Sequence, residues 1–210
     1  MTSAVFLDKL YKLLNWLKIL IWLNLLWIGF TVAGLGILGW APALVSVFGV
    51  LKKLLEKQTF YLPVFKIFLN NYKTYFIKSN LIGYLFLISF SSCWYILSKS
   101  SQLNEALFFI IALILGALMS LIVVAALFCI PVLLEEKNGY TEVIKISLDK
   151  GLRFIPYSVS VIASLIAMTS LFFFFSYLLI GLSVSLPAAM ISLINAQIER
   201  KETLEQTKDY

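Results

Sequence analysis

Four long stretches of the chain contain no charged residue, and they constrain the fold more than any other feature. They comprise 33 residues at 19–51, 20 at 79–98, 29 at 106–134 and 45 at 154–198. A helix needs roughly 20 apolar residues to cross a bilayer core about 30 Å thick, so each stretch can hold at least one crossing. Of the 210 residues, 61% are hydrophobic and only 13% are charged, which exceeds what a soluble core requires. The sequence therefore predicts an all-α integral membrane protein.

The basic residues predict how often the chain crosses the membrane. Lys and Arg concentrate in short loops on the cytoplasmic side. Three lysines precede the first stretch, and six follow it between Lys52 and Lys78. Placing both groups on one side requires an even number of crossings, so residues 19–51 should form a hairpin. Its turn is predicted at the glycines before Pro42, because glycine and proline interrupt helices.

The complete prediction is a polytopic transmembrane bundle with about six crossings and both termini in the cytoplasm. It is a single integral domain over 1–210, placed in the cell membrane, with spans at about 16–38, 42–56, 79–98, 105–134, 156–181 and 187–200. The limb after Pro42 is short, since about 14 helical residues rise only ~21 Å. A re-entrant limb there lowers the count to five. The count falls to four if the limb after Pro187 behaves alike.

An internal similarity relates the two cationic segments. Residues 54–69 and 133–148 share eight identities in 16 aligned positions at an offset of 79. A genuine repeat and a chance match between apolar segments are both open. We expect the element to be an amphipathic helix on the cytoplasmic membrane surface, over about 60–77 and about 140–154. The candidate partner-docking residues on these segments are Lys66, Phe68, Lys73, Glu135, Lys145 and Arg153.

The sequence lacks the side chains that most enzymes use. It contains no histidine, and its long apolar stretches contain no acid or base. Ser183 lies in a motif similar to the serine turn of intramembrane proteases, but no base is present to activate it. The chain has no phosphate-binding Gly-x-x-x-x-Gly-Lys loop, and two cysteines without histidine nearly exclude a zinc site. We expect no catalytic residue, cofactor or metal. A net charge of +6 fits loops that face anionic lipid, so we expect no nucleic-acid partner.

Uncharged polar and tryptophan residues in or near the predicted spans are the remaining candidate positions. They are Asn24, Trp27, Trp40, Asn80 and Asn195. Amides at membrane depth form interhelical hydrogen bonds. Alternatively, they line a cavity for an uncharged solute such as a sugar, with tryptophan stacked on its ring. A wet, open space around Asn24 would favour transport, and a packed, dry space would favour a scaffold.

Four short motifs carry a family resemblance. They are Asn-Leu-Leu-Trp at 24–27, Gly-Trp-Ala-Pro-Ala-Leu at 39–44, Phe-Leu-Asn-Asn-Tyr-Lys at 68–73 and Ser-Asn-Leu-Ile-Gly at 79–83. In this order and spacing they resemble the YesL-like family of bacterial integral membrane proteins, over about residues 10–85. The chain departs from the family at Trp40 and Ala41, where the resemblance leads us to expect Thr and Gly.

The resemblance implies a setting rather than an activity. The family has no established activity, and its members often accompany genes for sugar ABC transporters. We therefore expect a non-enzymatic accessory or permease-like component of carbohydrate uptake. Its partners would be the lipid bilayer and ABC-transporter subunits or other membrane proteins. The alternative is a structural or assembly factor that binds membrane proteins or lipid through its cytoplasmic surface helices.

Overall fold

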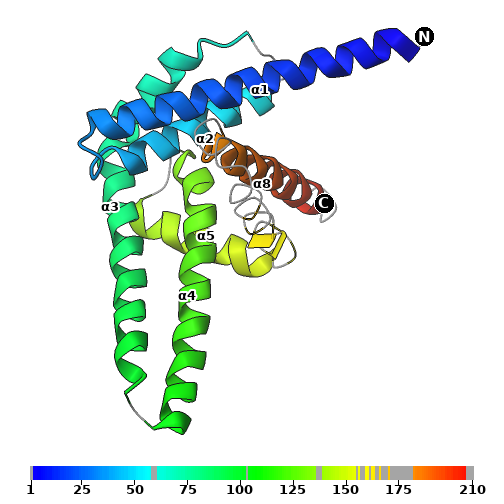
Figure 1. Ribbon diagram of the computed structural model, residues 1–210. Helices are drawn as coiled ribbons and strands as arrows, with labels where there is room; N and C mark the ends of the chain where they lie inside the picture. The colour runs from blue at the N-terminus through cyan, green and yellow to red at the C-terminus, as the bar shows by residue number, and fades with distance from the viewer. Residues whose placement is uncertain are drawn as a thin grey trace. The chain divides into compact units, whose positions relative to one another are not determined.

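The computed structural model describes residues 2–57, 61–102, 104–135, 139–154 and 182–206, with 156, 159, 160, 162, 163, 166 and 170. Within these ranges the chain contains six α-helices and no strand, so the all-α prediction is confirmed there (Figure 1). The chain forms two compact units, residues 1–76 with 159–210 and residues 77–158. A single membrane domain over 1–210 stays a prediction.

The first unit is built around a buried central helix. Its helical segments are α1 (Thr2–Ala33), α2 (Trp40–Lys57), the first part of α3 (Val64–Ser100) and α8 (Ser185–Gln206). Both α1 and α8 contact α2, and they also contact each other. Eleven of the 18 residues of α2 are buried, and Val47, Val50 and Leu51 have no exposed surface. The apolar residues of α2 therefore form the core of this unit.

The turn between α1 and α2 depends on glycine. Gly36 has a φ of +73°, a conformation that side chains with a Cβ disfavour. A Cβ on Gly34 would lie 2.7 Å from the backbone nitrogen of Gly39, and a Cβ on Gly39 would lie 2.6 Å from the carbonyl oxygen of Phe30. Only glycine lets the backbone approach this closely. The turn predicted before Pro42 is confirmed.

The course of α3 differs from the sequence prediction. The sequence predicts a surface helix over about 60–77 and a separate span over 79–98, but α3 is one continuous helix of 37 residues. No glycine or proline lies between Val64 and Ile82, so nothing interrupts the helical hydrogen bonds. The separate surface helix is therefore wrong. The boundary between the two units falls within α3.

The second unit contains the rest of α3, α4 (Glu105–Leu133) and α5 (Tyr140–Arg153). The side chain of Asn104 caps α4 by accepting a hydrogen bond of 2.9 Å from a backbone N–H. The Glu142 carboxylate accepts a hydrogen bond of 3.1 Å from the backbone N–H that precedes α5. α5 packs on α4, with Gly151 against Val124. A helix over about 140–154 is confirmed, and its place on a membrane surface stays a prediction.

Three described helices are long and apolar enough to cross a membrane, and they are Phe6–Ala33 within α1, Val64–Ser100 and Glu105–Leu133. Both α2 and α8, which contain the spans predicted over 42–56 and 187–200, carry at least four charged residues near their C-terminal ends. Neither helix is therefore among those long and apolar enough to cross a membrane, and the structure does not support six crossings. The span predicted over 156–181 lies largely outside the described residues.

Candidate functional site

Asn24 is held inside the first unit by hydrogen bonds to a distant part of the chain. Its side chain has no exposed surface. Its Oδ1 accepts a hydrogen bond of 3.1 Å from the backbone N–H of Val184, and its Nδ2 donates to Oγ of Ser183 at 3.4 Å. Both ends of the amide are therefore engaged. This geometry favours a packed structural position over a solute cavity.

Ser183 lies beside an amide rather than a base. Its Oγ is also 3.5 Å from Oδ1 of Asn24. A neutral amide cannot take the hydroxyl proton, because its oxygen is only a hydrogen-bond acceptor at neutral pH. The contacts of Ser183 with Asn24 thus provide no activation for nucleophilic attack.

The other candidate polar residues occupy separate positions. Nδ2 of Asn195 donates to Oε1 of Glu199 at 2.7 Å, one turn further along α8. Trp27 is half-buried, and its indole Nε1 has no hydrogen-bond partner among the described residues. Trp40 is half-buried at the start of α2, and Asn80 is buried in the second unit. The hydrogen bond of Asn195 stays within one helix, so it supports local structure.

Phe68 is not on an exposed surface. Its side chain is fully buried, and its ring centroid lies 5.1 Å from that of Phe30 in α1. This side of α3 faces α1, which makes Phe68 part of the core of the first unit. The prediction that Phe68 docks a partner is therefore wrong. Lys66 and Lys73 are exposed and keep their places as candidates.

The helix α5 is fixed on one side and open on the other. Its inner side includes Lys150, which is buried and whose Nζ lies 3.5 Å from Oε1 of Glu135. Glu135 makes this ion pair within the unit and is still partly exposed, so its role in docking stays a prediction. Lys145 and Arg153 are exposed. We define the α5 outer face as the exposed residues Thr141, Glu142, Lys145, Asp149, Leu152 and Arg153.

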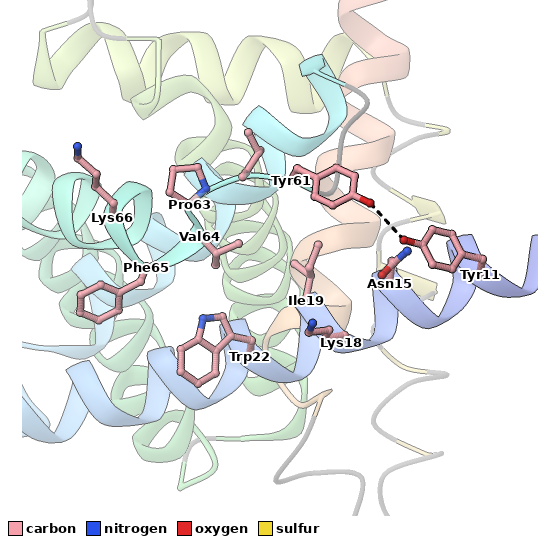
Figure 2. A pocket seen from close by; sticks show the side chains of 11 residues that line it. Tyr11, Asn15, Lys18, Ile19, Trp22, Tyr61, Pro63, Val64, Phe65 and Lys66 are labelled. Atoms are coloured by element: carbon pink, nitrogen blue, oxygen red, sulfur yellow. Dashed lines mark hydrogen bonds between the residues drawn. The ribbon is translucent and has the colours of Figure 1, made fainter. Parts of the chain in front are cut away.

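A groove of about 650 Å³ lies in the first unit, between α1 and the start of α3 (Figure 2). We call it the α1–α3 groove. Its lining residues are Tyr11, Asn15, Lys18, Ile19, Trp22, Tyr61, Leu62, Pro63, Val64, Phe65 and Lys66. These include two lysines and, within the described part of the chain, no acid. The volume falls in the range of about 300–1,000 Å³ that is typical of small-molecule sites.

One end of the groove carries hydrogen-bonding groups. The hydroxyl oxygens of Tyr11 and Tyr61 are 3.4 Å apart, so one phenol donates to the other (Figure 2). This hydrogen bond raises the pKa of Tyr61 above its usual value, so the phenol stays neutral at physiological pH. Asn15 and Lys18 follow along α1 beside this pair. The polar end therefore combines hydroxyl and amide groups with an ammonium group.

The other end of the groove is apolar and aromatic. Trp22 and Phe65 lie there, across from each other on α1 and α3 (Figure 2). They are 46% and 49% exposed, although both are large hydrophobic side chains. Ile19 and Val64 complete this part of the wall. The α1–α3 groove is thus amphipathic along its length.

The sequence reasoning missed the α1 wall of this groove. Tyr11, Asn15, Lys18, Ile19 and Trp22 recur at spacings of four, three, one and three residues, which places them on one helical face. That pattern was a usable signal. It mixes polar, cationic and aromatic residues, so a search for apolar faces does not find it.

Comparison with known proteins identifies a related region without an assigned activity. Residues 20–97 match the family described as "Protein of unknown function, DUF624". This region runs from within α1 through α2 and nearly to the end of α3. It therefore includes the turn between α1 and α2 but not α4 or α5.

Two curated proteins of Bacillus subtilis (strain 168) are similar to part of the chain. "Uncharacterized protein YteU" is 38% identical over 77 residues, which are 37% of this chain and 34% of that protein. "Uncharacterized protein YesV" is 38% identical over 93 residues, which are 44% of this chain and 42% of that protein. The chain thus spans well under half the length of these relatives. No solved structure matches.

Proposed function

We propose that this chain is a non-enzymatic integral membrane protein that binds another membrane protein through the α5 outer face. The partner is a subunit of an ABC-type carbohydrate uptake system, because the motifs of the first half resemble the YesL-like family. In this role the chain is an accessory component rather than the permease. The observation that carries the proposal is the contrast between the packed surroundings of Asn24 and the open, charged face of α5.

The contacts of Asn24 argue against a permease. A solute path at membrane depth needs polar groups that the solute can reach. The Asn24 amide is fully buried and bonded to Val184 and Ser183. These bonds join α1 to the segment before α8, so they stabilise the unit. An amide in this position supports a scaffold.

The α5 outer face has the properties of a protein-binding surface. Its helix is held against α4 by the close contact of Gly151 with Val124, and Lys150 adds a weak ion pair with Glu135, just after α4. A rigid element lowers the entropic cost of binding. The face carries acids and bases beside Leu152, which is 55% exposed. An apolar anchor within a charged rim is the usual anatomy of an interface.

The proposal includes six membrane crossings. The 18 residues of α2 rise about 27 Å, close to the roughly 30 Å of the hydrocarbon core. An even number of crossings before α3 keeps the lysines on both sides of the hairpin in the cytoplasm, together with α5 and both termini. Maleimide labelling of Leu35→Cys tests this topology. Labelling from outside the cell is expected, and labelling only after permeabilisation would contradict it.

Co-purification from native membranes tests the partner proposal. The double variant Lys145→Glu with Arg153→Glu reverses two cations of the α5 outer face. The matched control reverses two exposed cations at the end of α2, as Lys53→Glu with Lys57→Glu. Mass spectrometry after mild solubilisation should identify a transporter subunit with the wild type and the control. With the α5 variant, we expect the amount of co-purified transporter subunit to fall at least about tenfold. Equal retention in both variants would overturn the proposal.

An assembly factor is the second candidate, and the packing around Asn24 favours it as much as it favours an accessory subunit. The two roles differ in when the partner is bound. A pulse-chase experiment separates them by following the partner after its synthesis. Continued association with the mature transporter supports an accessory subunit. Release during maturation, with less transporter made when this chain is deleted, supports an assembly factor.

A further inference from the structure

Helix length places the α1–α3 groove at the edge of the membrane. The candidate span within α1, Phe6–Ala33, is 28 residues long and rises about 42 Å, against a hydrocarbon core of about 30 Å. About 20 residues counted back from the turn after Ala33 reach approximately residue 14. With α1 inserted, Tyr11 lies in the headgroup region and Asn15 lies at the boundary with the hydrocarbon. Lys18 lies about 6 Å inside that boundary, and its long side chain can extend back to the headgroups. Trp22 lies about 12 Å inside the hydrocarbon core.

The polar end of the groove suits an anionic group. The ammonium group of Lys18 provides positive charge, and the Asn15 amide and the free hydroxyl hydrogen of the phenol pair provide neutral hydrogen-bond donors. Lys66 adds positive charge at the other end of the groove, beyond Phe65 (Figure 2). No acid is present among the described residues of the lining. Phosphate oxygens accept several such hydrogen bonds at once, and lysine binds phosphate as a point charge. The charge pattern would therefore attract a phosphodiester.

The apolar end of the groove suits a hydrocarbon chain. The half-exposed rings of Trp22 and Phe65 and the side chains of Ile19 and Val64 line it. A free phosphate would leave this half of the groove unused. An anionic phospholipid has both features, because its phosphodiester is joined to apolar acyl chains.

We infer that the α1–α3 groove binds an anionic phospholipid, with its phosphate at the polar end and an acyl chain beside Trp22 and Phe65. This site is separate from the α5 outer face and lies in the other unit. Tests of lipid binding in the groove are therefore independent of tests of partner binding by α5. A bound lipid would tie the position of α1 to the start of α3.

Fluorescence quenching of the full-length protein in mild detergent tests this site. The probe is phosphatidylglycerol with brominated acyl chains, which quenches nearby tryptophan, and brominated phosphatidylcholine is the zwitterionic comparison. Trp22→Phe gives the signal of the other four tryptophans. We expect saturable quenching by phosphatidylglycerol in the wild type, and its loss in Trp22→Phe. Phosphatidylcholine should quench only at much higher mole fractions.

Charge-removing variants locate the lipid headgroup. Lys18→Gln should weaken phosphatidylglycerol binding about fivefold, and Lys66→Gln should weaken it less, because its ammonium group lies away from the polar end. Lys53→Gln removes an exposed cation outside the groove and should leave binding unchanged. Asn15→Leu removes a donor without a change of charge and should also weaken binding. Unchanged melting temperatures without lipid establish that the variants are folded.

Three results would overturn the inference. Equal quenching by both lipids would mean only a general lipid shell around the protein. An equal effect of Lys18→Gln and Lys53→Gln would mean attraction by net charge rather than by a site. Complete competition by millimolar inorganic phosphate would assign the groove to a free anion.

Discussion

The two segments related by the offset of 79 residues show the same burial pattern in two different units. On the two helices, corresponding residues that are buried in both include Phe68 and Ser147, Asn71 and Lys150, and Tyr75 and Phe154. Each series recurs at helical spacing, so the same side of the helix faces the protein in both segments. A genuine repeat predicts this agreement. The repeat itself stays a prediction.

The segments differ in how closely they approach the neighbouring helix. Tyr72 corresponds to Gly151 at this offset. The Tyr72 hydroxyl reaches across to α1 and donates to the carbonyl oxygen of Phe30 at 3.3 Å. Gly151 has no side chain, and a Cβ there would collide with Cγ1 of Val124. The first segment therefore fills a wider space with aromatic rings, whereas the second packs α5 closely on α4.

The segments also end differently. α3 continues to Ser100, but α5 ends at Arg153, and the backbone N–H of Phe154 donates to the carbonyl of Lys150 at 3.1 Å. Pro156 stands where the first segment has Ile77. Proline lacks an N–H and clashes with the preceding turn, so it stops a helix that isoleucine allows to continue. The earlier end of α5 fits the presence of a proline shortly after it.

The largest expected effect comes from removing the first pair of corresponding buried residues. Phe68→Ala deletes a fully buried ring, and we expect it to lower the free energy of unfolding by about 3 to 5 kcal/mol. Ser147→Ala deletes a hydroxyl that donates to the carbonyl of Val143 at 2.6 Å, and we expect a loss under about 1 kcal/mol. Denaturant unfolding in mild detergent measures both. Equal losses would contradict the different packing of the two segments.

Exchanging the residues at the helix ends should give the next largest effect. Ile77→Pro removes a hydrogen bond inside α3, and we expect it to cost about 3 kcal/mol. It should also speed amide exchange in the turn before residue 77. Pro156→Ile should change the stability by less than about 1 kcal/mol, because α5 has already ended. If Ile77→Pro left both the stability and the amide exchange of α3 unchanged, the continuity of the helix would not be what distinguishes the two segments.

The close approach of α5 to α4 predicts a smaller effect. Gly151→Ala should cost about 1 to 3 kcal/mol through its contact with Val124. Adding Val124→Ala should restore part of that loss. Gly116→Ala is the matched control, since nothing lies within 4 Å of a Cβ at that position. It should be neutral or stabilise α4 by up to about 1 kcal/mol. A loss in the control equal to that of Gly151→Ala would contradict the close contact.

The smallest expected effect concerns the buried cation of the second segment. Lys150→Met removes a charge from a buried position and keeps much of the side-chain volume. Replacement of a buried charge by an apolar group is often neutral, so we expect a change within about 1 kcal/mol. Glu135→Gln should cost about 1 kcal/mol or less, because the carboxylate is partly exposed and 3.5 Å away. Unfolding at low and high salt measures both. A strongly destabilised Lys150→Met would contradict this interpretation.

Sequence patterns predicted the helices better than their surroundings. The turn before Pro42, the helix at 105–134 and the helix at 140–154 all follow from glycine, proline and charge positions. The break expected near residue 78 failed because lysines signal a membrane edge without ending a helix. The segment after Pro42 is predicted as a span, but hydropathy does not distinguish a lipid-facing helix from one packed among other helices. The burial of α2 shows that it packs inside the first unit.

The candidate site was the less predictable part. Periodicity placed Phe68 on an apolar face, but it did not say that α1 covers that face. The α1–α3 groove joins residues from position 11 to position 66, and only the fold brings them together. The pairing of Asn24 with Ser183 is likewise a contact across 159 residues. One sequence without an alignment contains no direct record of such contacts.

Site-specific photocrosslinking in native membranes tests the central claim most directly, namely that this chain binds a membrane protein through α5. A photoreactive amino acid replaces Lys145 on the α5 outer face, and the matched control carries it at Lys53, an exposed cation of α2. The account predicts a discrete product only from position 145, in which mass spectrometry identifies a transporter subunit. No protein product from position 145, or the same product from both positions, would contradict it.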